Sequence, residues 1–227
     1  MWSTFETVTE TIKVRWDGGE VTARVAGDGR TGILLAHGAG TNQDHEFMVL
    51  LRDGLAGSGH TVMTFNYPYA ERGARGPDRV EKLISCHRSA AKMLEDSVDN
   101  LFLAGRSMGG RIGTYVVAEG LPAAGLVLYS YPLHPAGKPE KLRIDQFPDI
   151  HIPMLFFQGT RDALARMELF DAHIKPLRNA EVEILEGASH SPKTGGWTYE
   201  STVARLVAGT DAWIDHVSSG KTHEQAR

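Results

Sequence analysis

The sequence predicts an α/β fold of three layers, in which helices cover both faces of a mostly parallel central sheet. Three observations support this prediction. After an opening pair of β-branched segments, strand-like and helix-like segments alternate along the chain. The central strand-like segments, such as 32–36 and 101–105, are continuous apolar runs, which are typical of strands buried on both faces. The opening segments, 6–15 and 20–26, flank the turn signal Asp17-Gly18 and predict an antiparallel hairpin.

The remaining elements follow in order. Apolar or β-branched runs predict further strands at 61–66, 125–130, 152–159 and 181–186. Apolar residues at helical spacing predict helices over 45–57, about 78–98, the stretch after Ser107, 163–175 and about 196–216. Only about twenty residues, rich in proline, separate strand 125–130 from strand 152–159, so no large cap domain is expected. We expect a single domain over residues 1–217 and a polar tail over 218–227.

Composition excludes several classes of protein. Of the 227 residues, 41% are hydrophobic and 23% charged, which is ordinary for a globular domain. The net charge of −4 and the lack of a basic stripe argue against nucleic acid as a partner, and nothing indicates the oligomeric state. The single cysteine, Cys86, excludes an intrachain disulfide and a thiolate-cluster metal site. The apolar runs are too short to span a membrane and the N-terminus lacks a secretory signal, so we expect a cytoplasmic protein without a membrane partner.

A candidate nucleophile lies where a strand meets a helix. The segment 105–111, GRSMGGR, follows strand 101–105 and opens a helical pattern. Ser107 has a glycine two places before it and another two places after it. This spacing permits a sharp turn that presents a serine hydroxyl at the edge of a parallel sheet, above a helix N-terminus. On position alone, Ser107 is as readily interpreted as a helix cap.

Two later loops supply the partners that a serine nucleophile requires. Asp162 follows strand 152–159, and His190 follows strand 181–186. Histidine accepts the serine proton near neutral pH, and a carboxylate orients the imidazole. The carboxyl ends of parallel strands meet at one edge, and the chain order is that of a serine hydrolase on an α/β sheet. We therefore predict a catalytic triad; the alternatives are a helix cap for Asp162 and a surface position for His190.

Loops near the nucleophile supply further candidates. The loop after strand 32–36 begins His37-Gly-Ala-Gly, a turn that can direct a backbone N–H at the nucleophile. We assign the oxyanion hole to the backbone N–H groups of Ala39 and Met108; the alternative is a plain glycine turn before a helix. Three weaker candidates for substrate contact are His37, which is expected mainly to orient its loop, Arg106, for which ion pairing is the main alternative, and His134, an alternative base.

The sequence predicts no metal and no other cofactor. HEFMV at His45 lacks the second histidine of the zinc motif H-E-x-x-H. GDGRTG at 27–32 has the glycine spacing of a dinucleotide-binding fingerprint, but it precedes a strand instead of following one and opening a helix. It is therefore interpreted as a loop.

Longer phrases resemble a known family. LLAHGAGTNQDHEFM, AGRSMGGR, YSYPLHPAGKPEKLR and FFQGTRD are similar to the α/β-hydrolase superfamily and, within it, to a small dienelactone-hydrolase-like group. This group includes a subunit of a chromatin-associated acetyltransferase complex. The resemblance spans nearly the whole chain and implies the α/β-hydrolase fold with Ser107, Asp162 and His190 as the triad. Dienelactone hydrolases proper use a cysteine nucleophile where this chain has Ser107, which argues against the dienelactone substrate.

The sequence thus predicts a serine hydrolase with an open site. The most direct reading is a carboxylesterase that acts on short acyl esters of small molecules through an acyl-enzyme. Thioesterase or peptidase activity would use the same residues, because a fold does not determine a substrate. The alternative from another class is a non-catalytic α/β-hydrolase-fold scaffold that binds proteins, as the complex-associated relative suggests.

Overall fold

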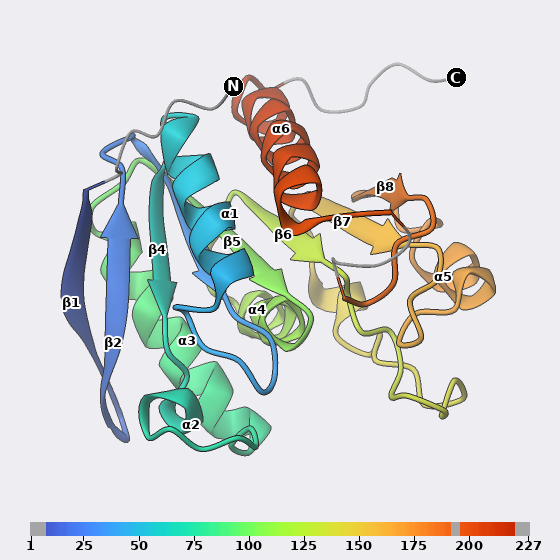
Figure 1. The fold of residues 1–227 in the computed structure, drawn as a ribbon, viewed down its shortest axis with the longest axis horizontal. Helices are drawn as coiled ribbons and strands as arrows, with labels where there is room; N and C mark the ends of the chain where they lie inside the picture. Colours follow the sequence, from blue (N-terminus) through green and yellow to red (C-terminus); the bar gives the residue numbers. More distant parts are fainter. Residues whose placement is uncertain (1–7, 192–195, 221–227) are drawn as a thin grey trace.

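The computed structural model describes residues 8–191 and 196–220, which form an eight-stranded sheet between two layers of helices (Figure 1). The strand order is β1-β2-β4-β3-β5-β6-β7-β8. The first two strands form the antiparallel hairpin, β2 is antiparallel to β4, and every later pair is parallel. The predicted fold class is confirmed. The strands are β1 (Thr9–Trp16), β2 (Gly19–Ala26), β3 (Thr31–Ala36), β4 (Thr61–Phe65), β5 (Asn100–Arg106), β6 (Gly125–Tyr129), β7 (Met154–Gly159) and β8 (Ala180–Leu185).

Two hydrophobic cores lie on opposite faces of this sheet. Successive side chains of a strand point to opposite faces. In β3, Ile33 and Leu35 pack with α1 (Glu46–Gly57) and α6 (Tyr199–Ser218), whereas Leu34 and Ala36 belong to the core under α3 (Val80–Glu95) and α4 (Met108–Ala118). Figure 1 shows α1 in front of the sheet and α3 behind it. Burial on both faces explains why the central strands are continuous apolar runs.

The structure differs from the predicted helices in two places. Segment 163–175 was expected to be helical throughout, but α5 covers only Met167–His173. The residues before it form a turn, because the N–H of Leu164 donates to the carboxylate of Asp162 and the N–H of Arg166 donates to His134. A short helix that the sequence pattern did not predict, α2 (Pro68–Glu71), follows β4 and has proline at its first position.

The connection between β6 and β7 contains only a single 3₁₀ turn, Phe147–Asp149. The described residues therefore contain no large cap over the sheet. Helix α6 ends at Ser218, and most of the predicted tail lies outside the described residues. Among the described residues, no helix combines the length and the apolar character that crossing a membrane requires.

Candidate active site

Ser107 forms the sharp turn between β5 and α4. Its backbone has φ 51° and ψ −114°, a conformation that a residue with a Cβ rarely adopts. Glycines make the turn possible. A Cβ on Gly105 would lie 2.4 Å from the nitrogen of Gly110, and a Cβ on Gly109 would lie 2.3 Å from the carbonyl oxygen of Ala36. The close approach of α4 to β3 and β5 therefore requires the glycines of the G-x-S-x-G spacing.

The structure brings the three residues predicted as a triad into contact at one edge of the sheet. The Oγ of Ser107 lies 2.9 Å from Nε2 of His190, and Nδ1 of His190 lies 2.8 Å from Oδ2 of Asp162. Ser107 occupies the N-cap position of α4, yet its side chain makes no capping hydrogen bond. When the proton of the neutral ring is on Nδ1 and is hydrogen-bonded to the carboxylate, the lone pair of Nε2 faces the serine hydroxyl. This is the geometry that a general base needs.

The carboxylate of Asp162 is held from two further sides. Its side chain is completely buried. Oδ2 accepts a second hydrogen bond, 2.9 Å, from Nε2 of Gln158, and Oδ1 accepts one of 2.8 Å from the N–H of Leu164. Gln158, fully buried near the end of β7, escaped the sequence analysis. Its position could have been noticed because it is a polar residue within the otherwise apolar strand MLFFQG.

The two predicted oxyanion donors are the backbone N–H groups of Met108 and Ala39. Met108 is the first residue of α4, and Ala39 lies in the exposed turn after β3. Within the described residues, neither backbone N–H donates a hydrogen bond to the protein. The N-terminus of α4 also carries a partial positive charge from the helix dipole. Both donors are thus chemically available to a negatively charged oxygen.

The other two histidines of interest support loops through the backbone. Nε2 of His37 accepts from the N–H of Tyr67 at 3.1 Å, and its Nδ1 donates to the carbonyl of Gly38 at 2.9 Å. Burial lowers the pKa of His37 to about 4, so its ring is neutral at pH 7. Nε2 of His134 accepts from the N–H of Arg166 at 3.1 Å, and its Nδ1 donates to the carbonyl of Pro135. With both ring nitrogens engaged, this geometry favours loop support over substrate contact.

Comparison with known proteins identifies the family of this chain. A model of the alpha/beta hydrolase domain family matches residues 29–215. The chain belongs to this family. Similar folds occur in dienelactone hydrolase from Anabaena variabilis (18% identity, TM-score 0.74, covering 93% of this chain and 98% of that chain), in the esterase Pf2001 from Pyrococcus furiosus (15%, 0.75, 96% and 95%) and in a serine hydrolase without a lid from Xanthomonas campestris (18%, 0.69, 99% and 100%). At these identities the three structures show a shared fold.

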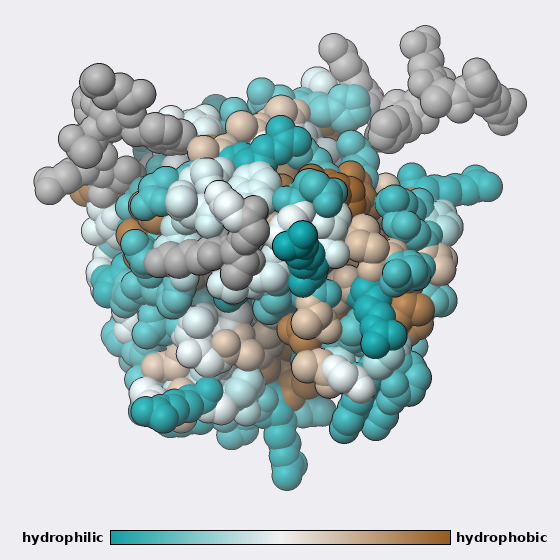
Figure 2. Space-filling model, turned by 45° about the vertical axis from the view of Figure 1, so that its right-hand side comes forward, coloured by the Kyte–Doolittle hydropathy of each residue, from teal (hydrophilic) through white to brown (hydrophobic). Residues whose placement is uncertain are grey.

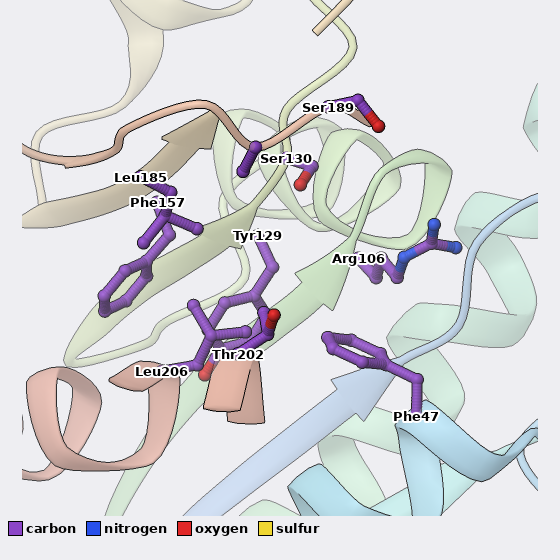
Figure 3. A pocket seen from close by; sticks show the side chains of 10 residues that line it. Phe47, Arg106, Tyr129, Ser130, Phe157, Leu185, Ser189, Thr202 and Leu206 are labelled. Carbon is purple, nitrogen blue, oxygen red and sulfur yellow. The ribbon is translucent and has the colours of Figure 1, made fainter. Parts of the chain in front are cut away.

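In this α/β-hydrolase domain, a hollow lies beside the candidate site on the side of the sheet covered by α1 and α6. It is lined mainly by apolar side chains from the ends of β6 to β8 and from both helices, and its polar members are Arg106, Ser130, Ser189 and Thr202. Figure 3 shows Arg106 and Phe47 at one end and Phe157 and Leu185 at the other. Figure 2 shows the molecule from the side to which the ends of β5, β6 and β7 point. Hydrophobic residues lie there within a mostly hydrophilic surface.

In the part of the chain that the structure describes, Arg106 does not form the ion pair that the sequence suggested as its main alternative role. Ion pairs were the main alternative for Arg106, but no carboxylate among the described residues forms one with it. Instead, Nη2 of Arg106 lies 3.2 Å from the carbonyl oxygen of His190.

Among the described residues, no group of three or more His, Cys, Asp or Glu side chains is arranged to hold a metal ion.

Proposed function

We propose that this protein is a serine hydrolase, specifically a carboxylesterase that cleaves short acyl esters of small molecules through an acyl-enzyme. The observation that carries the proposal is the hydrogen-bonded chain from Ser107 through His190 to Asp162, which starts at a strained turn. Strained backbone of this kind costs about 1–3 kcal/mol and is concentrated at functional sites. Membership of the alpha/beta hydrolase domain family supports the same chemistry.

In the first half of the proposed reaction, Nε2 of His190 takes the proton of Ser107 as Oγ attacks the ester carbonyl carbon. A tetrahedral intermediate forms, with its negative charge on the former carbonyl oxygen. The N–H groups of Ala39 and Met108 stabilise that charge, and one such donor is typically worth about 2.7–4 kcal/mol. Asp162 stabilises the imidazolium and keeps the proton of Nδ1 in place. The imidazolium then protonates the leaving alkoxide, which departs as an alcohol.

In the second half, water replaces the alcohol. His190 takes a proton from the water as its oxygen attacks the acyl carbon of the serine ester. The second tetrahedral intermediate uses the same backbone donors. Its collapse breaks the bond to Oγ, and His190 returns the proton to Ser107. A carboxylic acid leaves, and the resting enzyme is regenerated.

The surroundings of the serine support a small substrate and loose selection. Within the described residues, no large cap covers the carboxyl ends of the strands. A lipase-like preference for long acyl chains would need an extended apolar tunnel, whereas the cavity beside the site has a volume of only about 10 Å³. We therefore propose acetyl or similarly short acyl groups, with the alcohol part extending toward solvent.

Labelling with a fluorophosphonate probe tests the proposal, together with hydrolysis of p-nitrophenyl acetate. The wild-type protein is expected to react with the probe, and Ser107→Ala is expected to lose both labelling and turnover. His190→Ala is expected to lose turnover, whereas folded His134→Ala keeps most of it; the reverse pattern would transfer the base role to His134. A folded wild-type protein that neither labels nor hydrolyses the ester would favour the non-catalytic, protein-binding scaffold.

A further inference from the structure

Arg106 takes no part in the steps above, yet its side chain contacts three parts of the site. It is the last residue of β5, directly before the serine. Its Nη2 donates to the backbone carbonyl of His190 at 3.2 Å. Its guanidinium carbon lies 5.7 Å from the centre of the Phe47 ring of α1, and Figure 3 shows the two side chains together. The side chain thus joins the strand of the nucleophile, the loop of the base and helix α1.

The same guanidinium packs against the loop of the proposed oxyanion donor. A Cβ added to Gly38 would lie 3.2 Å from Nη1 of Arg106 and 3.7 Å from Cβ of Ser107. The residue before Ala39 is therefore separated from the arginine by little more than the volume of one methyl group. Glycine at this position lets the two loops and the guanidinium approach closely.

The charge of Arg106 is held without a carboxylate partner among the described residues. Burial lowers the pKa of this guanidinium, and the electrostatic effects of Tyr199 and Asp162 act in the opposite direction. A largely desolvated cation binds a carbonyl oxygen more strongly than a neutral donor does. The aromatic face of Phe47 adds a favourable cation–π contact. The bond from Arg106 to the backbone of His190 is therefore charge-assisted.

We propose that Arg106 is a positioning residue that clamps the loop of His190 against the loop of Ala39, so that base, nucleophile and oxyanion donor keep their mutual distances. The proposal rests on the proposed function for its catalytic consequence, but the clamp itself is a property of the fold. A displacement of about 1 Å at a reacting group can cost about 100-fold in rate. An arginine suits the task because its rigid planar fork reaches one loop while its face stacks on a ring.

Substrate binding would leave a different signature from positioning. Removing a residue that only binds the substrate raises KM, whereas removing a residue that positions the base lowers kcat. The site offers a matched control in Arg161, an exposed arginine one residue before Asp162, on the loop after β7. Arg161→Met removes the same charge from the same edge of the sheet without touching the clamp.

The kinetic test compares Arg106→Met, Arg106→Lys and Arg161→Met for hydrolysis of p-nitrophenyl acetate. We expect Arg106→Met to lower kcat about 10- to 100-fold while KM stays within about threefold. Arg106→Lys keeps the charge and a donor, so it should recover part of the loss. Arg161→Met should resemble wild type. An unchanged kcat in Arg106→Met, or a loss confined to KM, would overturn the positioning role.

Amide hydrogen exchange tests the clamp without any need for activity. The loop before His190 has backbone bonds of its own, such as the N–H of Ala188 to the carbonyl of Leu185. In Arg106→Met, exchange over residues 186–191 should accelerate about tenfold or more relative to wild type, and Arg161→Met should not change it. Unchanged exchange in Arg106→Met would refute the clamp whatever the activity. A wild-type protein without turnover or labelling would instead refute the proposed function.

Discussion

Replacing Asp162 by asparagine changes one atom at the centre of the hydrogen-bond network and leaves its shape intact. The asparagine has two orientations. If its oxygen takes the place of Oδ2, it still accepts from His190 and Gln158, but its NH₂ group then faces the N–H of Leu164. Two donors meet there, and leaving a buried donor unpaired costs about 1–3 kcal/mol.

The opposite orientation avoids this cost. The asparagine oxygen keeps the N–H of Leu164, and its NH₂ group takes the place of Oδ2. Oε1 of Gln158 is buried and has no partner within the described residues, so a rotation of that amide supplies an acceptor. The remaining N–H of the asparagine then donates to Nδ1 of His190. This arrangement puts the ring proton on Nε2, where it points at Ser107 and prevents proton abstraction.

The expected loss of activity follows from this preference. A difference of about 1–3 kcal/mol reduces the productive tautomer about 5- to 150-fold. Loss of the carboxylate charge beside the imidazolium adds to it, for a total of about 10⁴-fold in kcat, the effect known for the aspartate of a serine-protease triad. The melting temperature should change by only a few degrees, because the network is satisfied again.

The assay is steady-state hydrolysis of p-nitrophenyl acetate with thermal denaturation as the control for folding. Gln158→Leu in the Asp162→Asn background removes the amide that accepts from the asparagine, so the two orientations become closer in energy and part of the activity should return. A folded Asp162→Asn protein that retains more than about a tenth of wild-type kcat would refute the tautomer reasoning.

Three further predictions concern stability. Ser107→Gly should be more stable than Ser107→Ala by about 1–3 kcal/mol in urea denaturation, because only glycine adopts φ 51° without strain. Gly109→Ala should lose about 1–3 kcal/mol or more, and turnover with it, because the new Cβ would lie 2.3 Å from the carbonyl oxygen of Ala36. Burial lowers the pKa of His87 to about 3, against about 6.5 in the unfolded chain, so the unfolded state binds the proton first. The unfolding free energy is independent of this proton above about pH 6.5 and decreases as the pH falls toward 3. His87→Gln should therefore make the unfolding free energy fall less steeply over that range.

Each of these predictions has an outcome that contradicts it. Equal stability of the alanine and glycine variants at position 107 would show that the turn stores no strain. Wild-type stability of Gly109→Ala would mean that α4 can move away from β3 without cost. An identical pH dependence for wild type and His87→Gln would remove this histidine as a source of acid sensitivity, and His37, whose pKa burial also lowers, would be the next candidate.

Much of the fold could be predicted because its signals are local. Apolar runs such as 32–36 and 154–159 mark buried strands, and the turn signal Asp17-Gly18 marks the hairpin. The start of α5 could not be predicted, because it is delayed by Asp162 and by His134, whose side chains hold the preceding turn. That competition depends on contacts between segments far apart in the chain.

The sequence alone determined the architecture of this protein and the loops that carry Ser107, Asp162 and His190, because parallel strands end at a common edge and their order along the chain limits which loops can meet. Their catalytic role remains a prediction. Only the tertiary structure decided what Gln158 and Arg106 contact and that both nitrogens of His37 are engaged. A buried polar side chain takes whichever partner the packing brings within about 3 Å, and no pattern of neighbouring residues encodes that partner.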